Sequence, residues 1–218
     1  SKQDTTAICR VGYYTLHDNI AKIPVYGVYV LKPENALGCW PRTNAFTADA
    51  SLPRDKRATP DDYAGTGYDK GHNIPDGDLS YGEYVELESF LMSNMMPQIP
   101  NLNRGIWKLL ETSVRGWTVQ RNQSFTIYVG GIYDANDKKI GTGVVVPHAF
   151  YKIVINNQTV FNDLIYNPVL GTRQNRIRAV GLKTADWNGT LLSNGFLMML
   201  SDVEDWQPNT DYLRGSIV

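Results

Sequence analysis

The spacing of hydrophobic residues changes several times along this chain, and each change predicts a different element. Residues 11–31 are rich in Tyr, Val and Ile, which predicts strands joined by a turn near Asp18 and Asn19. Residues 33–67 are dominated by Pro, Gly, Asp, Asn and Thr. We therefore expect a long irregular segment there, which wraps the surface or carries function.

Two stretches near the middle of the chain have the three- and four-residue spacing of amphipathic helices. The first covers residues 84–92, and the second begins near Asn101. We expect Gly116 to weaken the last turn of the second helix. The stripe that should face the core comprises Leu102, Ile106, Leu109, Leu110, Val114 and Trp117.

The second half of the chain predicts mainly strands. Runs of β-forming residues occur at 125–133, 143–155 and 177–182, separated by Gly, Asn and Asp turn signals. Within residues 197–206 we expect a short helix capped by Ser201 and ended by Pro208. Because no repeat or linker interrupts this pattern, we expect one domain over residues 1–218.

Composition and charge limit the function classes. The chain has 218 residues, of which 42% are hydrophobic and 20% charged, with a formal net charge of -1. These values are typical of a folded protein, and the charge excludes a protein that coats nucleic acid through a globally basic surface. Any contact with nucleic acid must therefore be local. No apolar run is long enough to predict a membrane span.

Cys9 and Cys39 form neither a CxxC motif nor a Cys/His pair, which excludes a structural zinc site. A disulfide between them and two free thiols are equally compatible with the sequence. The chain starts at Ser1 without a basic and then apolar leader, as in a cytosolic protein or the mature form of an exported one.

The residues with the strongest chemical signal lie between positions 68 and 115. Asn103, Glu111 and Arg115 would span roughly 120° of one flank of a regular helix, beside its apolar stripe. A carboxamide, a carboxylate and a guanidinium near His72 suit phosphodiester cleavage, because a hard cation takes oxygen ligands and a phosphate takes a cationic clamp.

Four short motifs follow one another in this stretch: Asp69-Lys70-Gly71-His72, Ser93-Asn94 before Pro97-Gln98, Leu102-Asn103 before Trp107, and Leu110-Glu111. In order and spacing they resemble the signature of the DNA/RNA non-specific endonucleases of the ββα-metal (His-Me finger) class, which includes secreted bacterial nucleases and mitochondrial endonuclease G. The segments 42–49, 63–67 and 146–152 also resemble the family pattern, so the similarity covers most of the chain and is weak only after Lys152. One position departs from the signature, because Lys70 stands where the family has an arginine, and lysine lacks the planar fork for bidentate phosphate binding.

The resemblance implies an α+β fold with a largely antiparallel central sheet, packed helices and a ββα-metal motif. It also implies an endonuclease that hydrolyses DNA and RNA with little sequence preference, depends on Mg2+ with Mn2+ as a substitute, and leaves 5′-phosphate ends. DNA and RNA would be its substrates and an inhibitor protein a further partner, with no membrane involved. Its location would be secreted or periplasmic rather than cytoplasmic, in a bacterial, phage or plasmid context, and the oligomeric state stays open between monomer and homodimer.

The same resemblance assigns roles to individual residues. His72 would be the general base, Asn103 the metal ligand, and Glu111 an acceptor of hydrogen bonds from metal-bound waters. Asn94 would support the site by hydrogen bonding. The expected cationic contacts to the substrate are Lys70, Arg115 and Arg42 on the scissile phosphate and Arg104 on the flanking backbone.

Ordinary interpretations compete with these roles. From local sequence alone, His72 would be a locally bonded histidine, Asn103 a helix cap and Glu111 a solvated carboxylate. With the resemblance, Asn101 becomes the expected cap. We interpret Asp69, Asp76 and Asp78 as structural, and His17 and His148 as locally satisfied residues with no chemical company.

Two other function classes are considered. A metallohydrolase of small phosphoesters would assemble several Asp and His ligands, often around two metals, whereas this motif offers one placed histidine. A catalytically weak or inactive nucleic-acid-binding relative is disfavoured, because His72, Asn103 and Glu111 are all present and the net charge is poor for tight binding.

Overall fold

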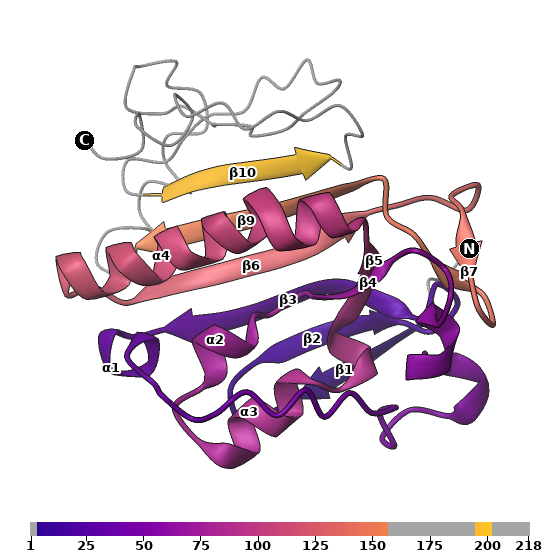
Figure 1. Ribbon diagram of the computed structural model, residues 1–218, viewed down its shortest axis with the longest axis horizontal. Helices are drawn as coiled ribbons and strands as arrows, with labels where there is room; N and C mark the ends of the chain where they lie inside the picture. The colour runs from indigo at the N-terminus through magenta and orange to yellow at the C-terminus, as the bar shows by residue number, and fades with distance from the viewer. Residues whose placement is uncertain (1–3, 157–194, 202–218) are drawn as a thin grey trace.

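A six-stranded antiparallel sheet organises the part of the chain that the computed structural model describes, residues 4–156 and the backbone of residues 195–201 (Figure 1). Its strands, in the order in which they lie side by side, are β1 (Thr5–Cys9), β2 (Tyr14–Asp18), β3 (Ile23–Leu31), β6 (Phe125–Ile132), β9 (Ala149–Asn156) and β10 (Gly195–Ser201). Each neighbouring pair is antiparallel. The α+β class with a largely antiparallel central sheet is therefore confirmed.

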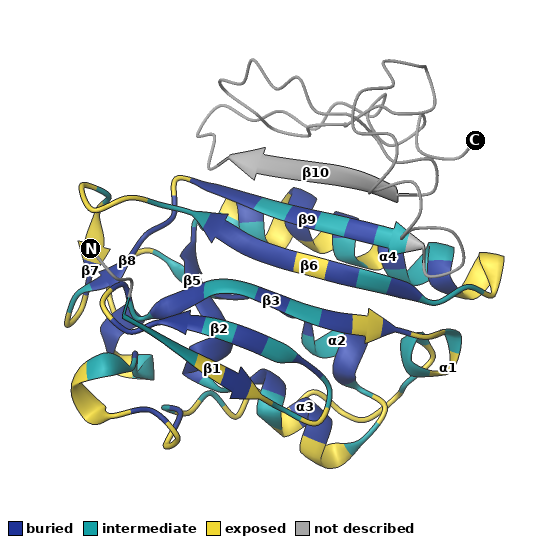
Figure 2. Ribbon diagram, turned by 180° about the vertical axis from the view of Figure 1, so that it is seen from behind, coloured by how far each residue is buried: buried dark blue, intermediate teal, exposed yellow. Residues whose placement is uncertain are grey.

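The helices cover one face of this sheet. Figure 1 shows them in front of the strands, and Figure 2, from behind, shows the other face without a helix among the described residues. They are α1 (Pro33–Ala36), α2 (Asp76–Leu79), α3 (Glu83–Ser89), the irregular turn η4 (Leu102–Trp107) and α4 (Lys108–Arg121), with short 3-10 turns η1 (Arg54–Lys56), η2 (Pro60–Tyr63) and η3 (Met92–Asn94). Two small two-stranded antiparallel sheets, β4 (Asp69–His72) with β5 (Met95–Gln98) and β7 (Lys139–Ile140) with β8 (Val144–Val145), complete the fold.

The main core lies between α4 and the sheet. The predicted stripe is confirmed at Leu102, Ile106, Leu110 and Val114, which are all buried. It is wrong at Leu109, which is 41% exposed, whereas Trp107 is almost fully buried. The irregular turn that precedes α4 shifts the helix phase, which a regular 3.6-residue pattern cannot anticipate. Gly116 does not lie in the last turn, because α4 continues to Arg121.

Other expectations can be compared with the strands directly. The predicted strands and turn within residues 11–31 and the strand at 125–133 are confirmed by β2, β3 and β6. Leu197 to Ser201 belong to β10 and pair with β9, so the part of the predicted tail before the expected cap is a strand. The helix expected after Ser201 and the strand expected at 177–182 lie outside the described residues. Cys9 and Cys39 are both free and exposed.

The segment at 33–67 is irregular as expected, apart from α1, η1 and η2. It is anchored by the buried carboxylate of Asp49, which pairs with Arg10 and accepts hydrogen bonds from the hydroxyls of Ser51 (2.6 Å) and Ser93 (2.5 Å). Thr47 adds backbone bonds to Phe90 and Met92 at the end of α3. These contacts hold residues 40–49 beside the paired strands β4 and β5.

Among the residues that the structure describes, no helix is long and apolar enough to cross a membrane.

We predict that Asp49→Asn lowers the free energy of unfolding at pH 7 by about 3 kcal/mol, because it leaves Arg10 unpaired and weakens two hydrogen bonds. Burial alone would raise the pKa of Asp49, but the hydrogen bonds from Ser51, Ser93 and Arg10 outweigh it and hold the pKa at about 2. This stabilisation is therefore complete above about pH 4 and is lost as the pH falls through 2. Urea unfolding at several pH values measures it, with Asp55→Asn as an exposed control; a pH-independent difference would contradict the prediction.

Candidate active site

His72 lies at the end of β4, where the antiparallel partner is Met95 of β5. Its ring is 8% exposed and packs against Phe90 and Phe46, with ring centroids 4.9 and 5.7 Å away. The guanidinium of Arg42 lies 4.9 Å from the Phe90 centroid, and the ammonium of Lys70 lies 4.9 Å from the Phe46 centroid. Two phenylalanines thus bring the expected base and two expected phosphate-binding cations into one group.

Burial sets the protonation state of this histidine. Burial lowers the pKa of His72, the Asp76 carboxylate raises it and the Arg42 cation lowers it, and the result of all three is a pKa of about 4. The Nε2 atom is buried without a hydrogen-bond partner among the described residues. At neutral pH the ring is therefore uncharged, and its buried Nε2 is unpaired within the described part of the chain.

Gly71, between Lys70 and His72, is required for a reason that the sequence did not suggest. Its backbone is extended rather than tightly turned, and the side chain of Gln98 occupies the place where a Cβ atom would project. Gln98 is fully buried. A side chain at position 71 would therefore force Gln98 to move within a fully buried site.

Asn94 supports the segment that follows His72. It is fully buried; its Oδ1 accepts from the Ile74 backbone at 3.0 Å, and its Nδ2 donates to the carbonyls of Ile74 and Ser89 at 2.9 Å each. If Asn94 only ended the preceding helix, its bond to Ser89 would be explained but its two bonds to Ile74 would not. The amide therefore joins the end of α3 to the chain beyond β4.

The Asn103 side chain is oriented by Asp69, the first residue of β4. Its Nδ2 donates to Asp69 Oδ2 at 2.9 Å, and Arg104 donates to the same carboxylate through Nε at 2.8 Å and Nη2 at 2.6 Å. The bonds from Arg104 hold the pKa of Asp69 below its usual value, and Asn103 adds to this. A carboxylate only accepts, so the amide nitrogen must face Asp69 and the oxygen of Asn103 is left for another partner.

The helix around Asn103 is irregular. Asn101 has helical φ and ψ and makes no side-chain cap bond, so its prediction as the cap is wrong. Leu102–Trp107 form a π-type turn with Gly105 outside helical φ and ψ. The chain therefore kinks at Gly105, and the regular-helix geometry that predicted Asn103, Glu111 and Arg115 on one flank does not apply across this kink.

Glu111 and Arg115 belong to a buried charge network between α4 and the sheet. Arg115 pairs with Asp78 at 2.6 Å, and Asp78 also accepts from the hydroxyl of Tyr29 at 2.5 Å. Lys152 of β9 lies 3.9 Å from Glu111. Burial raises the pKa of Glu111 to about 7, although the Lys152 cation acts against this. The solvated-carboxylate interpretation of Glu111 is therefore wrong.

The Asp76 carboxylate connects these two parts of the site. Burial has the largest influence on both His72 and Glu111, but Asp76 favours the protonated form of each, so both lie within its electrostatic reach. Its own ion-pair partner is Arg42. Asp69, Asp76 and Asp78 thus each hold an arginine, which agrees with the structural interpretation of the three aspartates although the reason is ion pairing and not turn formation.

Sequence reasoning missed Phe46, Phe90 and Lys152. The phenylalanines carry no chemical signal, since an aromatic residue is ordinarily part of a core. Lys152 does carry one, because a lysine inside an apolar β-type run implies either an exposed strand face or a buried partner.

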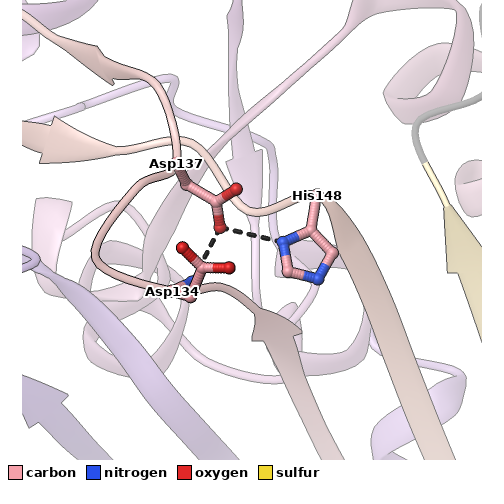
Figure 3. A group of neighbouring side chains, drawn as sticks. All are labelled: Asp134, Asp137 and His148. Atoms are coloured by element: carbon pink, nitrogen blue, oxygen red, sulfur yellow. Dashed lines mark hydrogen bonds and ion pairs between the residues drawn. The ribbon is translucent and has the colours of Figure 1, made fainter.

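A second polar group lies near the β7–β8 hairpin. Figure 3 shows Asp137 between Asp134 and His148, with His148 Nδ1 2.8 Å from Asp137 Oδ2. Among the described residues these three form a group whose ligand atoms lie within 4.8 Å of one another, close enough to hold one metal ion. The expectation that His148 has no chemical company is therefore wrong, whereas His17 is bonded locally, with Nε2 3.2 Å from the Lys56 carbonyl.

Comparison with known proteins gives a consistent result. A sequence profile described as DNA/RNA non-specific endonuclease matches residues 1–191. The chain is 37% identical over 120 residues to a nuclease from Nostoc sp., covering 55% of this chain and 43% of the relative. It is 30% identical over 158 residues to mitochondrial endonuclease G of Bos taurus, covering 67% of this chain and 52% of the relative.

A solved structure of an EndoG/EndoGI complex, which concerns the mechanism of EndoG inhibition, is similar with a TM-score of 0.62 and 25% sequence identity, over 69% of this chain and 67% of that chain. The chain spans about half the length of the curated relatives that it matches.

We predict that His72 in the metal-free protein stays neutral from pH 8 to about pH 5, because its pKa is about 4. Titration by NMR with ring-labelled histidine measures this directly. Phe46→Ala should raise the pKa toward the ordinary value of about 6.5 by opening the ring to solvent. A wild-type pKa of 6.5 or above would show that the ring is not buried in solution.

Proposed function

The chain belongs to the DNA/RNA non-specific endonuclease family, and on that premise we propose that it hydrolyses phosphodiester bonds of both DNA and RNA with the aid of a divalent cation, Mg2+ in the first place and Mn2+ as a substitute. The observation that carries the proposal is the buried, neutral His72 with a free Nε2, grouped with Arg42 and Lys70. A neutral imidazole beside two cations suits proton abstraction next to a bound phosphate.

In the proposed reaction His72 takes a proton from the water that attacks the phosphorus. Arg42 and Lys70 bind the scissile phosphate beside it, and Arg115 approaches from α4; together they offset the charge that grows on the phosphate in the transition state. The 3′ oxygen leaves, so the products carry 5′ phosphates. Arg104 is 71% exposed and lies at the edge of the site, where one side of its guanidinium faces Asp69 and the rest is open to the flanking backbone.

The residues of this site fit a hydrated divalent cation. Asn103 presents its amide oxygen because Asp69 takes the nitrogen, and none of the described residues donates a hydrogen bond to the Glu111 carboxylate. Asn103 would hold the ion directly and Glu111 would accept hydrogen bonds from its waters, as Mg2+ prefers oxygen ligands and keeps several waters. When bound, the cation supplies electrostatic stabilisation of the phosphate and of the leaving 3′ oxygen.

The rival hydrolase of small phosphoesters is less well supported. It needs several carboxylate and histidine ligands around one or two metals. In the described part of the chain the group of this kind is Asp134-Asp137-His148, which lies at a turn with His148 about half exposed.

The inhibitor partner is supported by the similarity to the EndoG/EndoGI complex. A secreted or periplasmic location rests on the resemblance to secreted bacterial nucleases.

We expect plasmid DNA and RNA to be degraded with Mg2+ and spared with EDTA. His72→Ala should reduce kcat/KM by about 10²- to 10⁴-fold on both substrates, the contribution of a general base. Asn103→Ala should raise the Mg2+ concentration needed for half activity, whereas His148→Ala should leave it unchanged. Full activity of His72→Ala would refute the assigned base, and a Mg2+ effect confined to His148→Ala would move the metal to the second polar group.

We also expect Lys70→Arg to preserve or raise activity, because arginine restores the planar fork for phosphate and can pack over the Phe46 ring as lysine does. Initial rates on plasmid DNA measure the effect, with Lys70→Met as the charge-removing comparison. A complete loss of activity in Lys70→Arg at unchanged stability would show that the site is built around lysine.

A further inference from the structure

Lys152 lies where an apolar residue would be expected. It belongs to β9, and its side chain is 1% exposed. Phe150 and Val154, two residues away on either side, share its face of the strand and are both buried in the core. A lysine is almost never fully buried without a partner, so the position requires a specific reason.

The ammonium faces one carboxylate and one ring. Lys152 Nζ lies 3.9 Å from Glu111 Oε1 and 5.0 Å from the centroid of Trp107. Neither Nζ nor Oε1 has a hydrogen-bond partner among the described residues. The two groups therefore attract each other through charge, and the Trp107 ring helps to keep the ammonium beside Glu111.

The other charges nearby do not replace Lys152. Glu111 also faces Asp78 and Asp76, which oppose its ionisation, and Arg115, which favours it. Arg115 is committed to Asp78 at 2.6 Å. Lys152 is itself favoured as a cation by Glu111 and Asp78 and disfavoured by Arg115 and by burial. Among the described residues of this network, Arg115 has Asp78 as its ion-pair partner, and Lys152 has Glu111.

We propose that Lys152 is a positioning residue of the nuclease reaction, whose ammonium favours the ionised form of Glu111 and fixes its carboxylate from the sheet side while the opposite side accepts hydrogen bonds from metal-bound water. The inference rests on the proposed function of Glu111. A purely structural core lysine would affect folding but not the charge of Glu111, so the two roles of Lys152 can be distinguished. A chain that lost this lysine would keep Asn103 and His72 but hold a neutral Glu111 at pH 7.

The experiment measures kcat and KM for plasmid cleavage against pH in Lys152→Met, which keeps the length of the side chain and removes its charge. We expect kcat at pH 7 to fall about 10- to 100-fold, KM to stay within about twofold, and the loss to shrink as the pH rises, because burial alone favours neutral Glu111. Lys152→Arg should retain the wild-type pH profile.

Two further variants separate charge from packing. Val154→Ala removes buried volume from the same face of β9 and should lower thermal stability without moving the pH profile. In a Glu111→Gln background, Lys152→Met should cause no further loss of kcat, since the charge that it supports is gone. An equal loss in both backgrounds, or a loss in Lys152→Met that is the same at every pH, would overturn the proposal.

A readout without activity tests the pair itself. Glu111→Gln should lower the pKa of the Lys152 ammonium by about one pH unit or more in the metal-free protein, measured by NMR of the labelled side chain. An unchanged pKa would overturn the proposal even if Lys152→Met does not fold. Absence of nuclease activity in the wild-type protein would instead refute the proposed function and leave this measurement intact.

Discussion

The packing of α4 on the central sheet is the interaction on which the candidate site depends. Leu110 and Val114 are buried from the helix side, and the ring of Trp107 lies 5.8 Å from that of Phe150 in β9. Because this face of the helix is fixed against the sheet, the flank with Glu111 and Arg115 is held at the rim of the core. Apolar burial of this size stabilises by several kcal/mol, far more than any single ion pair near the site. The charged groups therefore occupy positions that the core has already defined.

The arginines differ in how firmly they are held. Arg42 is 46% exposed, so its ion pair with Asp76 contributes little to stability and a phosphate can replace the carboxylate at small cost. Arg115 is paired with Asp78, whose side chain is 1% exposed and also bonded to Tyr29, so breaking this pair would leave a buried charge without a partner. The same residue type thus serves as an exchangeable contact in one place and as a fixed one in the other.

The sequence was most informative where signal and structure are local. The helical stripe, the strands around β3 and β6, and the order of the four motifs are encoded within short stretches of chain. It was least informative where a contact joins distant elements. Lys152 meets Glu111 only after β9 packs under α4, and Gly71 is explained only by Gln98 on the partner strand. Asn101 and Leu109 were misjudged because both predictions assumed a regular helix where the chain forms a π-type turn.

The irregular turn places Gly105 outside helical φ and ψ, in the middle of an otherwise helical segment. A continuous α-helix through Gly105 would have more regular backbone hydrogen bonding and would be favoured by most other residues at this site. It would also change the direction of the chain before Gly105, and with it the position of Asn103 relative to Glu111 and Arg115. A regular helix and the observed placement of Asn103 therefore exclude each other within a single turn. A homologue with a straight helix here would be expected to show the firmer scaffold and the poorer enzyme.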